Sequence, residues 1–334
     1  MKTKNNTRRR KRRHSSAKKR SRFRTRNWRE YNAALVQRGS LTLWLDEAVL
    51  QEWRNQERTG RRGTPRTYSD TAISTGLTLK MVYRLPLRAT EGLLSSLLKL
   101  MGLTQLSVPD HSTLCRRQKS LQMALPQQHK DHALHVVVDS TGCKIYGEGE
   151  WKVRQHGISK RRTWRKLHLA VDEASGEIVG AVLSTNDVAD SAALPALLEQ
   201  VEEPIAQLSG DGGYDKRPCY DTLRRHQEEQ GQPLRVTIPP RQGARIWQHG
   251  NSQAERLARD ENLRRVRQVG RRKWKEESGY HRRSLAETAM FRFKTIFGDK
   301  LSARVFENQA AEAFLRCAAL NRMTQLGMPD SYAL

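Results

Sequence analysis

One stretch near the C-terminus spaces four polar side chains at helical intervals. They are Tyr280, Arg283, Glu287 and Lys294, separated by three, four and seven residues. At ~100° per residue on an α-helix, all four fall within about 60° of one another. The opposite side of the same helix is apolar and consists of Leu285, Ala289, Phe293 and Ile296. A carboxylate among a phenol, a guanidinium and an ammonium group suits a metal ligand beside a nucleic-acid backbone. An ordinary amphipathic helix with a solvated polar face would show the same pattern.

Two aspartates upstream each come after a short apolar run. Asp139 follows Leu134–Val138 and precedes turn-forming residues, whereas Asp211 comes shortly after Ile205–Ser209 and precedes two glycines. Both runs are too short for a typical helix, so we predict buried strands that end at an acid. The glycines would let a substrate backbone approach closely. Carboxylates at strand ends, with one more from a helix crossing that edge of the sheet, could converge on divalent cations.

Other acids and one buried-strand histidine have structural interpretations. Asp172 precedes a predicted hairpin turn, Asp190 is predicted to be a helix N-cap, and Asp215 to cap the helix that follows it. His168 would point away from its apolar neighbours on a strand, and a role as ligand or general base is disfavoured.

Three motifs together resemble those of a known family. They are Val138-Asp139-Ser140-Thr141-Gly142, Gly210-Asp211-Gly212-Gly213-Tyr214-Asp215 and Tyr280-x2-Arg283-x3-Glu287-x6-Lys294. The combination is similar to that of DDE transposases from bacterial insertion sequences, in particular family five. The likeness covers roughly residues 28–330. The helical signature at its full spacing is the specific part, since each aspartate motif alone is weak.

The resemblance implies a catalytic and metal-binding triad of Asp139, Asp211 and Glu287. It also implies two Mg²⁺ or Mn²⁺ ions, with the first acid bridging both and the other two taking one each. The groups that would hold DNA phosphates near the cut are Tyr280, Arg283 and Lys294. The implied function is a transposase that binds the terminal inverted repeats of its insertion sequence. It would cleave DNA at the element ends by metal-dependent hydrolysis and join the 3′-hydroxyl ends to target DNA.

Basic residues alternate with tryptophan between the two aspartates. The candidate DNA contacts in this segment are Lys152, Arg161, Arg162, Trp164, Arg165 and Lys166. Such a segment could hold a DNA backbone or stack an unpaired base. Trp164 would equally suit an anchor in the hydrophobic core.

The charge of the chain favours a polyanionic partner, most simply nucleic acid. Its 334 residues carry 61 Lys and Arg against 35 Asp and Glu, a formal net charge of +26. Residues 1–27, predicted to be a disordered basic tail, hold 14 of these basic residues and no acid; without them the charge is still +12. The tail has no amphipathic apolar face, and no apolar segment suits a signal peptide or a membrane span. We therefore expect no membrane partner and a cytoplasmic, nucleoid-associated bacterial protein.

Residues 28–130 have a helical pattern. A helix capped by Ser69-Asp70, a second over Leu87–Leu98 and a third opened by Pro109-Asp110 look like a helix-turn-helix. The third helix carries the candidate DNA contacts His111, Ser112, Arg116 and Arg117. A plain three-helix bundle with a basic face is the alternative.

From about Ala133 the pattern becomes α/β. Three strands, a helix, a strand, a helix and a strand follow in the order of a ribonuclease-H-like fold. The predicted fold class is an α/β ribonuclease-H-like catalytic domain, with a mixed five-stranded sheet and helices, over residues 131–334. An all-α helix-turn-helix-like DNA-binding domain precedes it. Residues 241–278 are arginine-rich and are predicted to be an inserted charged helix with loops, touching DNA or simply solvated.

Two other function classes remain open. One is a non-catalytic, sequence-specific DNA-binding regulator, and the other is a ribonuclease-H-like nuclease without strand transfer. The predicted partners of a transposase are the inverted repeats and target DNA, with a homo-oligomer, dimer or larger, in the synaptic complex.

Overall fold

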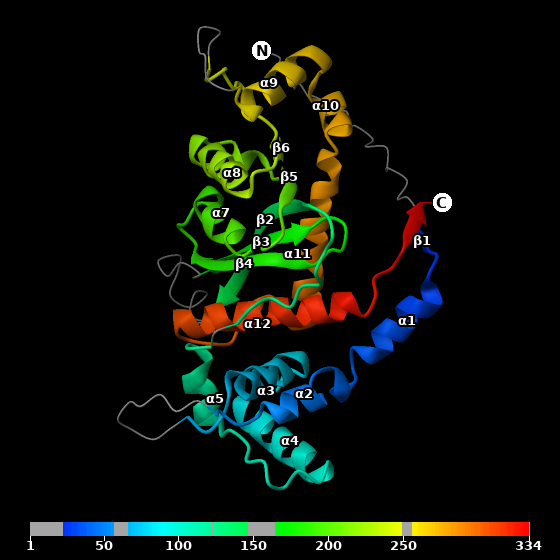
Figure 1. Ribbon diagram of the computed structural model, residues 1–334, viewed down its shortest axis with the longest axis vertical. Coiled ribbons are helices and arrows are strands. Elements are labelled where there is room, and N and C mark those ends of the chain that lie inside the picture. Colours follow the sequence, from blue (N-terminus) through cyan, green and yellow to red (C-terminus); the bar gives the residue numbers. More distant parts are fainter. Residues whose placement is uncertain (1–22, 57–65, 122, 146–163, 249–255, 334) are drawn as a thin grey trace, which may run out of the picture.

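A mixed six-stranded sheet forms the centre of the C-terminal part of the chain (Figure 1). The computed structural model describes residues 23–56, 66–121, 123–145, 164–248 and 256–333. The strands are β2 (Leu134–Ile145), β3 (Trp164–Asp172), β4 (Ile178–Thr185), β5 (Ile205–Ser209), β6 (Arg235–Thr237) and β7 (Lys300–Leu301). Their order is β4-β3-β2-β5-β6, with β7 beside β2. β2, β3 and β4 are antiparallel neighbours, whereas β5 and β7 run parallel to β2, and β6 parallel to β5.

Helices cover both faces of this sheet, which fits a ribonuclease-H-like fold. They are α7 (Asp190–Leu198) and α8 (Arg217–Gln230) on one face, and α11 (Ser284–Phe297) and α12 (Phe306–Gln325) on the other. Val136 and Val138 pack toward the first face and Val137 toward the second, as the period of two along a strand predicts. The predicted number of five strands is wrong, because the two-residue β7 pairs with the end of β2.

Helices also precede the sheet along the chain. They are α1 (Trp28–Gln37), α2 (Glu47–Gln51), α3 (Asp70–Val82), α4 (Leu87–Leu100) and α5 (His111–Gln118). The hydroxyl of Ser69 accepts a hydrogen bond from the N–H of Ala72 at 3.0 Å, which confirms the predicted cap of α3. A Cβ on Gly76 would lie 3.2 Å from both Leu94 and Leu114, so this glycine allows α3, α4 and α5 to pack closely.

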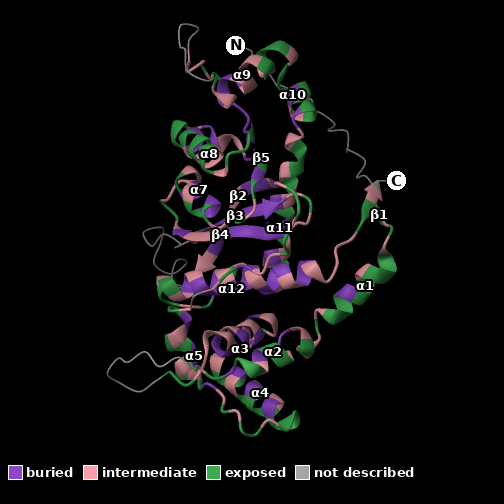
Figure 2. Ribbon diagram, viewed as in Figure 1, coloured by how far each residue is buried: buried purple, intermediate pink, exposed green. Residues whose placement is uncertain are grey.

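α12 lies between these helices and the sheet (Figures 1 and 2). It contacts β4 on one side and α3 on the other, and its buried residues are spread over most of its circumference. A single hydrophobic core therefore runs from Trp53 and Leu77 to Phe293. The segments 28–130 and 131–334, predicted as separate domains, share this core.

The arginine-rich insertion contains two helices, α9 (Ala258–Val269) and α10 (Arg271–Glu277). The insertion thus has two helices where one charged helix with loops was predicted. The two helices are divided at Gly270, whose φ of 82° lies in a region that glycine tolerates and other residues avoid.

The two ends of the described chain meet in a small separate sheet. β1 (Phe23–Thr25) pairs antiparallel with β8 (Ser331–Ala333). The side chain of Asn27 adds hydrogen bonds of 2.9 Å to the carbonyl of Met328 and 2.8 Å from the N–H of Asp330. The prediction of disorder is therefore wrong for residues 23–27, while residues 1–22 lie outside the described residues. Within the described ranges, no helix is both long enough and apolar enough to cross a membrane.

Candidate active site

Asp139 lies in the middle of β2, where the pairing on one side of that strand is interrupted. β3 pairs along β2 from Val136 to Lys144, so the turn predicted directly after Asp139 is wrong. On the other side, β5 pairs with β2 only up to Val137, and β7 begins at Lys144. Among the residues that the structure describes, the stretch of β2 between these pairings has no strand on that side, and Asp139 lies within it.

Asp211 follows β5 and caps a 3₁₀ turn over Gly212–Tyr214. Its Oδ1 accepts a hydrogen bond of 2.8 Å from the N–H of Gly213. A Cβ on Gly213 would lie 2.8 Å from the same oxygen, so any side chain there would displace the carboxylate. Because β5 is parallel to β2, its carboxyl end brings Asp211 to the same edge of the sheet as Asp139.

The signature helix begins later than predicted. Tyr280–Arg283 forms a 3₁₀ turn after Gly279, whose φ is 70°, and α11 starts at Ser284. The prediction that one α-helix carries all four polar residues is therefore wrong. The buried face also differs, because it consists of Ala286, Ala289, Met290, Phe293 and Phe297, while Leu285 and Ile296 are only half-buried.

Arg283 nevertheless connects two of the three predicted acids. Its Nη1 donates to Oδ2 of Asp139 at 2.9 Å, and its Nη2 donates to Oε1 of Glu287, one helical turn further along. Its guanidinium carbon lies 5.8 Å from the centre of the Tyr280 ring. The guanidinium thus holds a carboxylate of the sheet against a carboxylate of α11.

The three acids also interact electrostatically. Burial raises the pKa of Asp139 above its usual value, and the charges of Asp211 and Glu287 raise it further. The N–H of Ser140 and the Arg283 guanidinium act in the opposite direction. A cation close to Asp139 would therefore relieve an unfavourable accumulation of negative charge.

Carboxylate oxygens are the donors that Mg²⁺ and Mn²⁺ prefer, so the chemical type of these three side chains suits such ions. In the described part of the chain, however, no three His, Cys, Asp or Glu side chains lie close enough together to hold a metal ion. The side chain between Asp139 and Glu287 is that of Arg283. Closure around a metal would require this guanidinium to move away.

The remaining predicted DNA contacts of the C-terminal part have varied surroundings. Lys166 donates to the carbonyl of Val188 at 2.9 Å, and Arg165 donates to Gln309 at 2.9 Å. Trp164 is half-buried and covers Gly142 of β2, where a Cβ would lie 3.2 Å from its ring. Lys294 is half-buried on α11. The other three, Lys152, Arg161 and Arg162, lie outside the described residues.

On α5, two of the four predicted DNA contacts have firm intramolecular partners. Arg117 donates to Asp70 and, at 2.9 Å, to the carbonyl of Tyr68, and His111 contacts Glu91 at 2.9 Å. Ser112 and Arg116 are exposed, although each also has a partner within its own turn of chain, Asp110 for the first and Thr113 for the second.

Three acids that were assigned simple turn or cap roles lie in larger networks. Asp190 is the first residue of α7 rather than its N-cap, and it accepts from the hydroxyl of Ser140 at 3.0 Å. Asp172 is buried in its hairpin turn and pairs with Lys130 at 2.9 Å. The predicted helix cap, Asp215, has a different partner altogether.

Asp215 fixes the arginine-rich insertion to the sheet edge. It is 5% exposed, and its Oδ1 accepts from Nε of the buried Arg259 at 2.9 Å. Nη1 of Arg259 also donates to Asp260 at 3.1 Å and to the carbonyl of Arg245 at 2.7 Å. Sequence reasoning missed this network, since no spacing rule relates Asp215 to a residue so far along the chain.

Comparison with known proteins gives consistent findings along most of the chain. Two family models, both described as "Transposase DDE domain", match residues 36–148 and 130–322, the second covering more than half of the chain. One solved structure is titled "Cryo-EM structure of piggyBac transposase synaptic complex with hairpin DNA (SNHP)". It aligns over 86% of this chain and 73% of that chain, with 10% identity and a TM-score of 0.36.

Proposed function

The chain belongs to the family of transposase DDE domains, and we propose that it is the transposase of a bacterial insertion sequence of the family-five type. Membership in the family indicates an enzyme that cleaves and joins DNA. The proposed substrates are the terminal inverted repeats of the element and its target DNA. The observation that best supports this site is the bridge from Asp139 of β2 through Arg283 to Glu287 of α11.

Asp139, Asp211 and Glu287 are the residues that we assign to divalent metal binding, as ligands of two Mg²⁺ or Mn²⁺ ions. When bound, such ions would activate the attacking oxygen and stabilise the leaving oxygen of an in-line displacement. The protein contributes oxygen donors on two rigid elements, the central strand β2 and helix α11, and a third on the turn after β5.

Arg283, Tyr280 and Lys294 hold DNA in the proposed complex. The planar fork of Arg283, which engages two carboxylates, can engage two oxygens of a phosphate in the same manner. Burial raises the pKa of Tyr280, so its hydroxyl keeps its proton and can donate it to a phosphate oxygen. Lys294 supplies a point charge further along α11.

Two displacements at phosphorus complete the proposed reaction. In the first, a water molecule loses a proton as its oxygen bonds to phosphorus at the element end, the bond to the 3′ oxygen breaks, and that oxygen takes up a proton. In the second, the resulting 3′-hydroxyl loses its proton and bonds to a target phosphorus, whose own 3′ oxygen leaves and is protonated. Both ends of the element must be held for this, so we propose a dimer or larger homo-oligomer in the synaptic complex.

The test uses the purified full chain, Mg²⁺, a labelled duplex carrying the repeats that flank the coding sequence, and supercoiled target DNA. We expect a cleaved 3′ end and a joint product, both absent for Asp139→Asn although end binding remains. Asp221→Asn, which removes an exposed acid of α8, is the control and should behave as wild type. Cleavage without a joint product would identify a nuclease, and end binding without either product would identify a regulator.

A further inference from the structure

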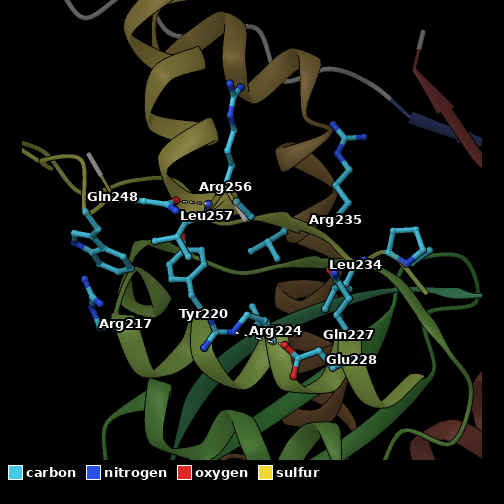
Figure 3. A pocket seen from close by; sticks show the side chains of 16 residues that line it. Arg217, Tyr220, Arg224, Gln227, Glu228, Leu234, Arg235, Gln248, Arg256 and Leu257 are labelled. Carbon is cyan, nitrogen blue, oxygen red and sulfur yellow. Dashed lines mark hydrogen bonds and ion pairs between the residues drawn. The ribbon is translucent and has the colours of Figure 1, made fainter. Parts of the chain in front are cut away.

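A groove with an apolar floor and arginine sides lies on the face of the sheet opposite α11 (Figure 3). It runs between α8, the start of β6 and the arginine-rich insertion, and its volume is about 1080 Å³. The floor includes Tyr220, Leu223, Leu234, Val236 and Leu257, and the arginines are Arg217, Arg224, Arg235 and Arg256. Figure 3 shows Arg217 and Arg235 toward opposite ends of the hollow, with Tyr220 and Leu257 between them.

The groove keeps a positive charge, because four arginines line it against one acid, Glu228. Arg224 lies 3.9 Å from Glu228 and 3.8 Å from Asp221, and each of these side chains is at least half exposed. Exposed pairs of this kind on a helix contribute little stability, so they leave Arg224 able to turn toward a stronger anionic partner. All four arginines are exposed.

One wall of the groove is preformed. Trp247 is held by the guanidinium of the buried Arg259, 3.8 Å from its ring centre, and by the ring of Tyr220, whose centre lies 5.6 Å away in a T-shaped arrangement. Arg217 lies 5.1 Å from the same ring. Trp247 is therefore fixed in place, with two guanidinium groups beside its ring, and a ligand would not have to order this wall.

We propose that this groove binds an unpaired strand of DNA, with phosphates on the arginines and bases on the apolar floor. Proteins that hold single strands combine these two features, a basic track for the backbone and apolar or aromatic side chains against the bases. A duplex would present its phosphates and leave the floor unfilled, because its bases are stacked inside. α8 rises about 15 Å from Arg217 to Gln227, the length of roughly four stacked nucleotides at 3.4 Å each.

The proposal rests on the proposed function, because strand cleavage at the element end supplies an unpaired strand. The insertion leads from the groove directly to the active site: α9 starts beside Leu257, and α10 ends before Tyr280. The ring of Trp274 on α10 lies 6.1 Å from the ring of Tyr280. A strand released beside Tyr280 would thus follow the insertion around the edge of the sheet to reach the groove.

The test compares two DNA probes and three variants of the full chain. The probes are a fluorescein-labelled thymidine dodecamer and a duplex of the element end, and affinities are measured by fluorescence anisotropy at several salt concentrations. The double variant Arg224→Gln/Arg235→Gln removes two groove charges, and Ala206→Trp fills the floor without changing charge. Arg225→Gln is the matched control, since it removes the neighbouring exposed arginine of α8, which does not line the groove.

We expect the double variant to bind the dodecamer at least tenfold more weakly than wild type. Its slope of log K against log salt should fall by roughly 1.4, at ~0.7 per phosphate contact of a single strand. Ala206→Trp should weaken the same complex several-fold, while binding of the duplex by both variants and of both probes by Arg225→Gln should stay within twofold.

Unchanged binding of the dodecamer by the double variant, or an equal loss in Arg225→Gln, would overturn the proposal. A loss in the double variant without one in Ala206→Trp would also overturn it, because the floor would then have no role. A change of oligomeric state in light scattering, with dodecamer binding intact, would assign the groove to an acidic segment of a second copy instead. Wild-type protein from the same preparations is also tested for cleavage of the element ends. If it cleaves them, any of these negative results concerns the groove alone and does not contradict the proposed function.

Discussion

Removal of the Arg259 side chain tests whether the arginine-rich insertion is fixed to the catalytic part by one buried cation. The side chain of Arg259 is 4% exposed, those of Asp215 and Asp260 are 1% and 0% exposed, and its nitrogens contact both acids. Arg259→Met keeps most of the volume and the contact with Trp247 but leaves two buried carboxylates without their cation. Each acid retains backbone donors, the N–H of Arg241 for the first and that of Trp247 for the second.

Breaking a buried ion pair by removing one partner costs about 3–5 kcal/mol. We therefore expect Arg259→Met to lower the free energy of unfolding by that amount, measured by urea denaturation at neutral pH. Arg264→Met is the matched control, because Arg264 lies on the same helix and pairs with Glu261 at 2.7 Å while both side chains are at least 40% exposed. An exposed pair spaced in this way contributes about 0.3–0.5 kcal/mol.

A double variant tests whether this loss comes from an unpaired buried charge. Asp215→Asn in the Arg259→Met background removes one such charge and should recover part of the stability, with a coupling energy of roughly 0.5–3 kcal/mol. A loss below 1 kcal/mol in Arg259→Met, or a double variant as unstable as the sum of its two single variants, would refute the argument.

Four further outcomes are expected. Asp139→Asn should raise the melting temperature in metal-free buffer at neutral pH. The folded state raises the pKa of Asp139, so the wild-type protein loses stability as pH rises through that pKa. The difference in melting temperature between variant and wild type should therefore vanish in acid. Asp211→Asn and Glu287→Gln should each abolish cleavage of labelled element ends, and their double variant should be little worse, because these acids act as one unit. Deletion of residues 1–22, which hold 12 basic residues, should flatten the slope of log K against log salt for duplex binding. If half of these residues contact phosphate, the slope should fall by roughly five, at ~0.9 per contact, and an unchanged slope would exclude such contacts. Residues 28–130 alone should show no cooperative thermal transition in circular dichroism, because α12 and its share of the common core are missing.

Features that depend on near neighbours were predictable. The pairing of Arg283 with Glu287 follows from a spacing of four residues, which survives although the turn before it is 3₁₀ rather than α-helical. The cap at Ser69 follows from its side chain and position, and the order of strands and helices follows from hydrophobic periodicity. Each of these signals is contained within a few residues of sequence, so no knowledge of the fold is needed to read it.

Features that depend on distant parts of the chain were not predictable in the same way. A local rule makes Asp190 and Asp215 helix caps, because an acid just before a helix usually has that role. The fold instead gives one of them the hydroxyl of Ser140 and the other the guanidinium of Arg259. The continuation of β2 beyond Asp139 likewise depends on β3, which supplies hydrogen-bond partners that a turn would have lacked.

Contacts between distant parts of the chain also explain how the acids of the candidate site can lie together. Burial and two neighbouring carboxylates raise the pKa of Asp139. This effect alone would favour the protonated acid, which would no longer serve as a metal ligand. Arg283 opposes this by holding Asp139 and Glu287 at once. The polar stripe read from the sequence as a phosphate-binding surface therefore also supplies the counter-ion of the acids. In the proposed reaction these two roles exclude each other, so the arrival of a DNA phosphate on Arg283 and the release of the carboxylates for cations become one event.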